Sequence, residues 1–228
     1  MIDVINLSKD YKIHGKTYSV LCDVSMHIDE FEKVAIVGKS GSGKTTLLNI
    51  VSGLLKETEC DVLIGDASIC KMSGKERSKF RKNNIGMVLQ DSLLLHELNA
   101  YQNIEIPLKI RKYSKTDRAQ KIEEILEELD IIELKNKYPR QLSGGEKQRI
   151  AIARALVYKP KILLMDEPTG SLDGENVENI RSILNKLRAT VLLVTHDNDV
   201  AEGCDSIYEI KGGSLTRVRM KNVKKQEK

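Results

Sequence analysis

The chain has 228 residues, of which 40% are hydrophobic and 31% are charged. This length and composition suffice for one large domain or two small ones with a real core, and they exclude a disordered or fibrous protein. Aromatic residues make up only 4% of the chain and include no tryptophan. They provide little material for base stacking, so nucleic acid is not an expected partner.

The charge distribution and the apolar runs also indicate where in the cell the protein is located. No uncharged apolar run comes near the roughly 18 residues of a membrane-spanning helix, and the first residues lack the pattern of a secretory signal. We therefore expect a cytoplasmic protein, and the four cysteines without a CxxC pair fit reduced thiols. The net charge of +4 comes from a basic tail, residues 217–228, which carries +5 against −1 for the rest of the chain. We predict that this tail is solvated or attracted to an anionic surface or partner.

Strands are predicted near the start of the chain. Residues 4–8 and 18–28 have strand character and are joined by a polar turn around His14-Gly15-Lys16. Residues 62–65 resemble a further strand. We interpret these segments as a mixed sheet on the N-terminal side of the fold.

Four later runs are short, continuous and aliphatic, which is typical of strands buried on both faces of a parallel sheet. They are residues 34–37, 85–89, 162–165 and 191–194. Polar residues follow each run, namely the glycine-rich segment from Gly38, Gln90, Asp166-Glu167 and Thr195-His196-Asp197. Because ligands bind outside the carboxyl ends of such strands, the four ends predict one converged site.

Helical periodicity replaces the strand pattern between the second and third of these runs. The apolar residues recur at helix spacing with glutamates around them, at Ile122, Ile125, Leu126, Leu129 and Ile132. This spacing predicts an amphipathic helix with a solvated acidic face. We expect a helical insertion over about residues 91–158.

The segment from Gly38 to Thr45 fits the pattern G-x-x-x-x-G-K-[ST] of a P-loop, between a predicted strand and a good helix sequence. Its glycines let backbone N–H groups curl around phosphates, and the helix start adds partial positive charge. Lys44 is expected to reach the β and γ phosphates, and Thr45 to offer its hydroxyl to Mg²⁺. The predicted nucleotide-binding residues are Gly38, Ser40, Gly41, Ser42, Gly43, Lys44, Thr45 and Thr46.

Two carboxylates follow the third buried run. Asp166 is at the position expected for the acid that holds magnesium. Glu167, the next residue, is placed to deprotonate the water that attacks the γ-phosphate. The pattern therefore predicts hydrolysis as well as binding.

A second phosphate-cradling helix start lies far along the chain from the P-loop. Ser143 is a natural N-cap, and Gly144 and Gly145 leave their backbone N–H groups unobstructed. One γ-phosphate does not need two such cradles from one chain. The segment Leu142-Ser143-Gly144-Gly145-Glu146 resembles the L-S-G-G-Q signature of the ABC ATPase family, with Glu146 in place of the usual Gln.

The resemblance extends along nearly the whole chain and implies further roles. Gln90 matches the Q-loop, which senses magnesium and the attacking water. Asp173 lies in the D-loop match, His196 matches the switch histidine that holds the γ-phosphate, and Tyr11 matches the aromatic residue that stacks on adenine. The family implies that two protomers trap two ATP molecules, each between one P-loop and the opposite Ser143-Gly144-Gly145.

The implied fold is α/β, a P-loop NTPase of the ABC ATPase type with a parallel-sheet core, an N-terminal antiparallel β subdomain and a helical insertion. The ATPase domain spans residues 1–216 and the basic tail residues 217–228. Metal ligands are Thr45, Gln90 and Asp166, catalytic residues are Glu167, His196 and Gln90, and the cofactors are ATP and Mg²⁺.

Within the family, the sequence looks like the branch of macrolide exporters, lipoprotein-release ATPases, antimicrobial-peptide-resistance transporters and a cell-division ATPase. That branch works with a separate membrane subunit, which implies a permease partner and a place at the cytoplasmic face of the membrane. The apolar residues Leu93, Leu94, Leu95, Leu98 and Tyr101 are either a groove for that subunit or core packing.

Three other functions are alternatives to this one. The first is an ATPase that drives a cell-division or signalling complex without transport, which the sequence does not separate from a transporter. A GTPase needs an N-K-x-D segment, whose nearest match, Ser114-Lys115-Thr116-Asp117, lies in a polar helical stretch. A nucleic-acid-directed ABC ATPase is expected to carry coiled-coil arms, zinc modules or a second cassette, and the sequence has none of these.

Overall fold

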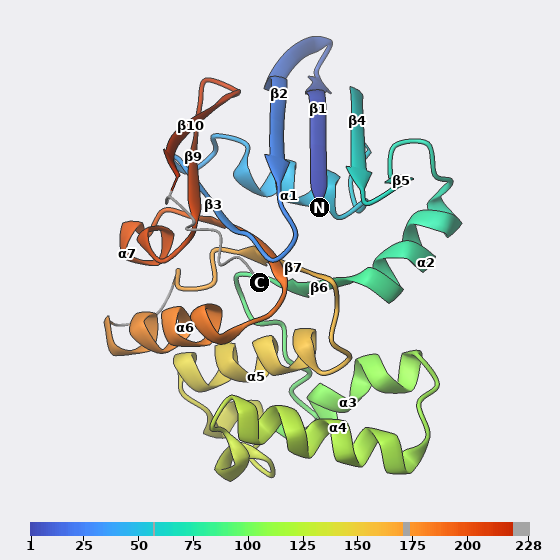
Figure 1. Cartoon of the computed structure of the whole chain (residues 1–228), viewed down its shortest axis with the longest axis vertical. Helices are drawn as coiled ribbons and strands as arrows, with labels where there is room; N and C mark the ends of the chain where they lie inside the picture. The colour runs from blue at the N-terminus through green and yellow to red at the C-terminus, as the bar shows by residue number, and fades with distance from the viewer. Residues whose placement is uncertain (57, 171–173, 221–228) are drawn as a thin grey trace, which may run out of the picture.

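The computed structural model describes residues 1–56, 58–170 and 174–220, and in it an antiparallel sheet lies above a larger central sheet with helices below (Figure 1). The antiparallel sheet has the order β2-β1-β4-β5. Its strands are β1 (Ile2–Ile13), β2 (Lys16–Ile28), β4 (Glu59–Ile64) and β5 (Ala67–Ser68).

All three pairings in this sheet are antiparallel, so the interpretation as a mixed sheet is wrong and the antiparallel subdomain is what forms. The reason is local. Ile13 pairs with Lys16, and the two residues between them have positive φ angles, 49° at His14 and 77° at Gly15. A two-residue turn of this kind matches the twist of a hairpin and returns the chain directly beside itself.

The central sheet has six strands in the order β10-β9-β3-β8-β7-β6. Its strands are β3 (Lys33–Val37), β6 (Ile85–Val88), β7 (Ile162–Asp166), β8 (Thr190–Thr195), β9 (Ser206–Lys211) and β10 (Ser214–Met220). The pairings from β9 to β6 are parallel, and β10 is antiparallel to β9. The four aliphatic runs therefore form the parallel strands that their sequences predict.

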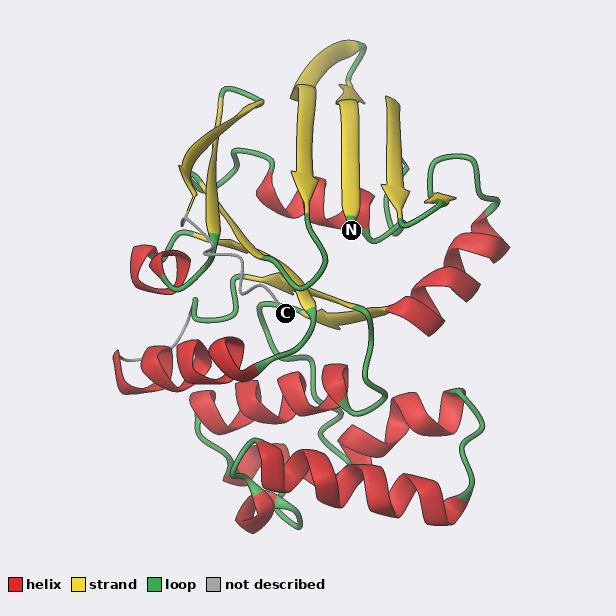
Figure 2. Cartoon of the chain, in the orientation of Figure 1, coloured by secondary structure: helices red, strands yellow, loops and turns green. Residues whose placement is uncertain are grey.

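The helices lie mainly on the side of the central sheet away from the antiparallel sheet (Figure 2). They are α1 (Lys44–Val51), α2 (Gly74–Asn84), α3 (Ala100–Ile110), α4 (Lys115–Glu128), α5 (Gly144–Leu156), α6 (Gly174–Lys186) and α7 (Asn198–Glu202), with short 3-10 turns at Ile132–Leu134 and Pro139–Gln141. Among the described residues, no helix combines the length and apolarity required to cross a membrane.

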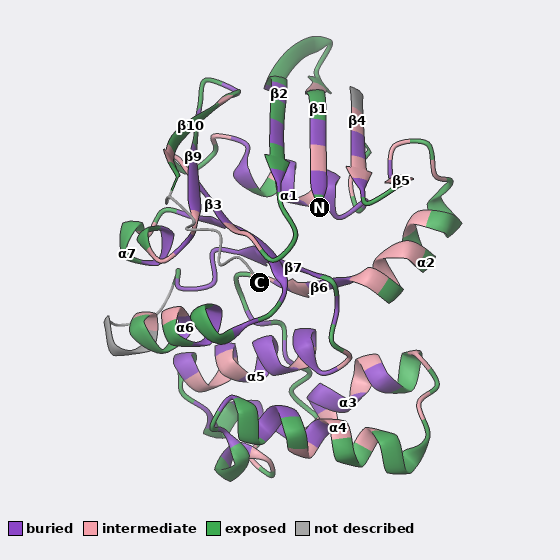
Figure 3. Ribbon diagram, viewed as in Figure 1, coloured by how far each residue is buried: buried purple, intermediate pink, exposed green. Residues whose placement is uncertain are grey.

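The central sheet separates two hydrophobic cores, and its inner strands β7 and β8 are buried on both faces (Figure 3). Along β8, Val191 and Leu193 join the core shared with α3, α4 and α5, whereas Leu192 and Val194 join the core shared with β1, β2 and α1. Successive side chains of a strand point to opposite faces of the sheet, which causes this alternation. It explains why the runs are aliphatic throughout.

Two predicted boundaries differ from the structure. The amphipathic helix ends at Glu128 because Asp130 adopts a left-handed φ of 52°, and Ile132 lies beyond it with 43% of its surface exposed. The basic tail does not start at Arg217. Residues 217–220 belong to β10, where Arg219 donates to the carbonyl of Glu202 at 2.7 Å, and the rest of the tail lies outside the described residues.

A buried amide fixes the loop between β6 and α3. The Asn103 side chain is 0% exposed, and its Oδ1 accepts a hydrogen bond from the N–H of Leu95 at 2.8 Å. Its Nδ2 donates to the carbonyls of Leu95, Leu98 and Asn99 at 3.0 to 3.1 Å. The Leu95 and Asn99 carbonyls also accept backbone N–H groups, from Leu98 at 3.2 Å and from Asn103 at 2.9 Å. The Asn103 side chain thus adds a second partner there and also holds the Leu95 N–H and the Leu98 carbonyl.

We expect Asn103→Leu to lower the free energy of unfolding by roughly 1 to 3 kcal/mol, because it removes the hydrogen bonds that a fully buried side chain makes to the backbone of this loop. Chemical denaturation measures this loss. Gln120→Leu is the control, since Gln120 makes a single exposed bond to Glu124, and it should stay within about 0.5 kcal/mol of wild type. Equal unfolding free energies for wild type and Asn103→Leu would contradict the prediction.

Candidate nucleotide-binding site

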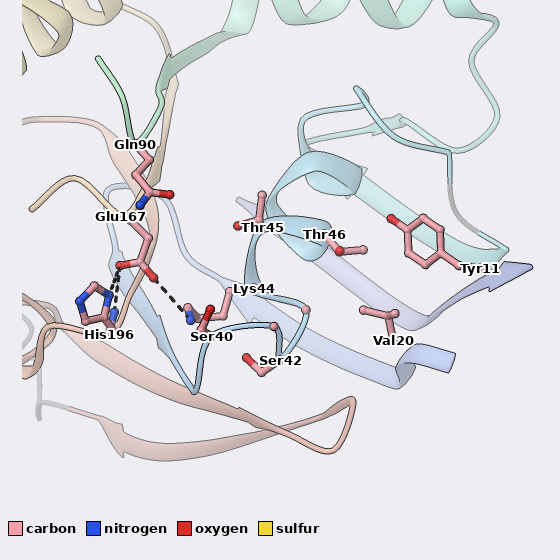
Figure 4. Close-up of a pocket in the computed structure, with 12 residues that line it drawn as sticks. Tyr11, Val20, Ser40, Ser42, Lys44, Thr45, Thr46, Gln90, Glu167 and His196 are labelled. Carbon is pink, nitrogen blue, oxygen red and sulfur yellow. Dashed lines mark hydrogen bonds and ion pairs between the residues drawn. The ribbon is translucent and has the colours of Figure 1, made fainter. Parts of the chain in front are cut away.

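A cavity of about 620 Å³ opens at the carboxyl ends of the central strands (Figure 4). Its lining comes from β1, β2, the P-loop, α1 and the segments after β6, β7 and β8. The residues are Tyr11, Val20, Ser40, Gly41, Ser42, Gly43, Lys44, Thr45, Thr46, Gln90, Glu167 and His196. The polar strand ends therefore meet in one place.

The P-loop needs glycine at particular positions. Gly41 and Gly43 have φ angles of 77° and 102°, which side-chain-bearing residues rarely adopt. A Cβ on Gly43 would also lie 3.0 Å from the carbonyl oxygen of Val20, and a Cβ on Gly38 would lie 2.7 Å from that of Ile210. Glycine thus allows the loop to pass close to β2 and β9 and to begin α1 facing the cavity.

Lys44 is the central cation of the site. Its side chain is only 6% exposed, and its Nζ donates to the carbonyls of Gly38 at 2.7 Å and Lys39 at 3.2 Å. The same Nζ lies 3.4 Å from Oε1 of Glu167. The ammonium group is therefore held by the loop itself, in the position where a phosphate would meet it.

Glu167 is held between two elements by opposite ends of its carboxylate. Oε1 faces Lys44, and Oε2 accepts from the backbone N–H of His196 at 3.0 Å and lies 2.8 Å from its Nδ1. Glu167 has a left-handed φ of 45°, and its own N–H donates to the carbonyl of Val194 at 2.9 Å. Backbone strain of this kind persists only where neighbours enforce it, and it clusters at functional sites.

Asp166 and Thr45 form an oxygen pair beside this carboxylate. The Thr45 hydroxyl donates to Oδ1 of Asp166 at 3.1 Å. Burial raises the pKa of Asp166, the Thr45 hydrogen bond opposes this, and the charge of Glu167 adds to the rise. A hydroxyl and a carboxylate are donors that fit a hard divalent cation, whose charge would offset the burial.

The other end of the cavity is apolar. Tyr11 on β1 and Val20 on β2 line it, on the far side of the P-loop from Glu167 (Figure 4). The site therefore has a polar end, with Lys44 and Glu167, and an aromatic end. This matches the two parts of a nucleoside triphosphate.

Val20 lines the cavity, but the sequence does not predict it as a site residue. Tyr11 pairs with Tyr18 across the hairpin, and Val20 lies two residues further along β2. The register shifts between Lys9 and Asp10, next to Val20, so alternation along β2 does not by itself place the Val20 side chain beside Tyr11. Only the folded hairpin shows that Val20 lines the aromatic end of the cavity.

The predicted signature residues lie apart from the cavity. Ser143, Gly144 and Gly145 open α5 and do not line it. The Ser143 hydroxyl accepts from the N–H of Glu146 at 3.2 Å, and Oε2 of Glu146 accepts from the N–H of Ser143 at 2.7 Å. The Glu146 side chain thus completes a capping box. Asp173 lies outside the described residues.

Comparison with known proteins decides the family. Residues 21–170 match the family model described as "ABC transporter". The chain belongs to the ABC transporter family. It is 39% identical over 220 residues to the lipoprotein-releasing system ATP-binding protein LolD of Syntrophotalea carbinolica, covering 95% of this chain and 97% of LolD. It is 36% identical over 219 residues to the bacitracin export ATP-binding protein BceA of Halalkalibacterium halodurans, covering 94% and 87%.

Among solved structures, the fold is similar to the dimeric post-hydrolysis state of the ATP-binding cassette MJ0796 bound to ADP and Pi. The TM-score is 0.87 at 38% identity, over 96% of this chain and 99% of that one. The family and the ABC ATPase fold predicted from the sequence are confirmed. As a member of this family, the protein is an ATP-binding subunit and an ATPase.

The Glu146 capping box gives a pH-dependent prediction. The hydrogen bond from the Ser143 N–H holds the pKa of Glu146 below its usual range, and Lys137 at 3.3 Å adds to this. A lowered folded pKa contributes stability above the unfolded pKa, which is lost as the pH falls through the folded value. We expect wild type to exceed Glu146→Gln in unfolding free energy near neutral pH, and the difference to vanish on acidification.

Denaturant titrations of both proteins from neutral pH down to about pH 3, below the usual glutamate pKa, measure this difference. Glu133→Gln is the control, because the Glu133 side chain makes no hydrogen bond or ion pair within the described part of the chain and lies on the 3-10 turn at Ile132–Leu134. A constant difference between wild type and Glu146→Gln across this range would contradict the assignment.

Proposed function

We propose that this protein is the ATP-hydrolysing subunit of an exporter-type ABC transporter that moves an envelope substrate, such as a peptide, lipoprotein or drug, through a separate permease. The observation that carries the proposal is the convergence of Lys44, Glu167 and His196, with contacts of 2.8 to 3.4 Å, at one end of a cavity built on a P-loop. The similarity to BceA and LolD supports the substrate class.

The nucleotide would lie along the length of the cavity. The adenine ring would stack on Tyr11, and the phosphates would reach the N–H groups and hydroxyls at the start of α1. Backbone donors and the helix N-terminus favour phosphate here. The residues proposed to hold the phosphates are Gly38, Ser40, Gly41, Ser42, Gly43, Lys44, Thr45 and Thr46.

We assign Mg²⁺ to Thr45, Asp166 and Gln90, which provide a hydroxyl, a carboxylate and an amide oxygen. Mg²⁺ usually takes one or two carboxylates and completes its shell with waters and substrate phosphates. In that position the ion would neutralise charge on the β and γ phosphates. It would also relieve the electrostatic cost of burying Asp166 next to Glu167.

Glu167 is the proposed general base. Its carboxylate would take the proton from the attacking water, and His196 would hold the γ-phosphate. In the structure Lys44 pairs with Glu167, so an arriving phosphate competes for Lys44 and releases Oε1 of Glu167. Binding of ATP would in this way free the base only when its substrate is present.

The second half of each site would come from another protomer. Ser143, Gly144 and Gly145 lie outside the cavity of their own chain, with N–H groups at the start of α5 directed to meet a phosphate. Head-to-tail pairing would bring them to the γ-phosphate bound by the opposite P-loop. The dimeric MJ0796 cassette supports this arrangement.

We assign the docking site for the permease to an apolar groove of about 350 Å³. Leu93 and Leu95, 56% and 49% exposed, line it together with Ile106, Pro107 and Ile110 of α3. The predicted patch therefore divides into two parts. Leu94 is buried in the core, Tyr101 packs against that core, and neither Tyr101 nor Leu98 lines the groove. Docking here would place the protein at the cytoplasmic face of the membrane.

We expect purified Glu167→Gln to form an ATP-dependent dimer of about twice the 25.7 kDa chain and to release little phosphate. The amide cannot accept the water proton, and loss of the base should slow turnover by about 10² to 10⁴-fold. Light scattering and phosphate release with ATP and Mg²⁺, beside wild type, measure both effects. A monomer that hydrolyses ATP at the wild-type rate would refute the base and the sandwich together.

We expect Leu93→Glu with Leu95→Glu to abolish recruitment to the permease while ATP affinity stays unchanged, because charged side chains in an apolar groove oppose docking. Co-purification with the membrane subunit and nucleotide titration measure the two properties. Leu54→Glu is the matched control, since Leu54 is equally exposed, at 53%, and lies outside the groove. Normal recruitment of the double variant would remove the groove from the proposal.

A further inference from the structure

The three residues after Gln90 form a strained turn that joins the nucleotide cavity to the apolar groove. Ser92 and Leu93 have φ angles of 57° and 42°, in the left-handed region that residues with side chains avoid. Gln90 lines the cavity on one side of this turn, and Leu93 lines the groove on the other. A short segment in such a conformation needs to be held from outside.

The holding groups come from α5. Arg154 donates to two successive carbonyls of the turn, Ser92 at 2.6 Å and Leu93 at 2.7 Å. The Ser92 hydroxyl donates to Oε1 of Gln148 at 2.6 Å, and both residues are buried, at 8% and 3% exposed. The turn is thus fixed at its middle by two side chains of one helix.

The same helix begins at the predicted signature residues. Ser143 caps its N-terminus, Gln148 lies in its middle, and Arg154 lies in its last turn, where it also lines the groove. A helix is stiff along its length. A displacement of either end of α5 therefore moves the point at which the Gln90 segment is held.

We propose that Gln148 and Arg154 are positioning residues for Gln90, which clamp the Ser92-Leu93 turn so that Gln90, the groove and the signature end of α5 keep one fixed relation. The inference rests on the role proposed above for Gln90 in hydrolysis. Neither Gln148 nor Arg154 lines the nucleotide cavity. They act on the reaction only through the turn.

Fold stability alone does not explain the amide at position 148. Ser92 Oγ pairs with one of its two polar atoms, and Nε2 is buried without a hydrogen-bond partner among the described residues. A buried donor left unpaired costs free energy that an apolar side chain of similar size would not. The amide offsets this cost by accepting the hydrogen bond from Ser92, which an apolar side chain could not do.

The test compares kcat and KM for ATP in the full chain carrying Ser92→Ala, Gln148→Leu or both. Each single change removes the same hydrogen bond and loosens Gln90, so kcat should fall about tenfold, an effect typical of small misplacement of a catalytic group. KM and the affinity for ATP should stay unchanged, because the P-loop is untouched. The double variant should be no slower than the slower single variant, as one interaction is lost in all three.

Ser68→Ala is the matched control, since the Ser68 hydroxyl donates to Asp61 at 2.7 Å in the antiparallel sheet and Ser68 lines neither the nucleotide cavity nor the groove. It should keep the wild-type kcat. Thermal unfolding of each variant tests whether the fold is intact, and Ser92→Ala, which deletes only one oxygen, retains the test if Gln148→Leu folds poorly. Wild-type kcat for Ser92→Ala and Gln148→Leu, or strictly additive losses in the double variant, would overturn the clamp.

Gln90→Ala in the same assay distinguishes failure of the clamp from failure of the role proposed for Gln90 in hydrolysis. A lower kcat for Gln90→Ala with normal values for Ser92→Ala and Gln148→Leu overturns the clamp and leaves the proposed role of Gln90 intact. A wild-type kcat for Gln90→Ala refutes that role and the clamp with it. Lower values for all of these variants, with Ser68→Ala normal, support both.

Discussion

Burial of the central sheet on both faces is the constraint on which the rest of the structure depends. Every residue of β7 and β8 is buried, and their side chains alternate between two separate cores. Polar groups placed within these strands would lose their hydration without compensation. Chemistry is therefore confined to the strand ends, where Asp166, Glu167 and His196 meet the P-loop in the position that open parallel sheets offer to ligands.

The charges at these strand ends satisfy one another before any ligand arrives. Lys44 is 6% exposed and has the carboxylate of Glu167 and two loop carbonyls as partners, while Oε2 of Glu167 is held by His196. A buried cation without such partners would be unstable. In the proposed function, the negative charge of a triphosphate would take over the role of Glu167 toward Lys44.

How much could be predicted from sequence depended on how local the signal was. The P-loop and the aliphatic runs are contiguous, so the parallel sheet and the cavity followed directly. Helix α2 buries none of its residues and has no apolar stripe to reveal it. The antiparallel pairing of β1 and β2 depended on the φ angles of two turn residues. Which leucines near Leu93 are buried and which are exposed depended on a loop that Asn103 holds, eight residues beyond Leu95. The bond between Ser92 and Gln148 joins residues 56 positions apart, which spacing along the chain cannot show.

Helix α5 links these separate observations. Glu146 cannot turn toward a phosphate without giving up the N–H of Ser143, so the cap fixes the geometry of the signature end. The Arg154 side chain, in the last turn, cannot move away without breaking its hydrogen bonds to the carbonyls of Ser92 and Leu93. The signature end and the groove end belong to one helix. A permease bound in the proposed groove and a nucleotide bound in the partner's P-loop would therefore act on the same element, and coupling between the two proposed sites would require only that α5 move as a unit.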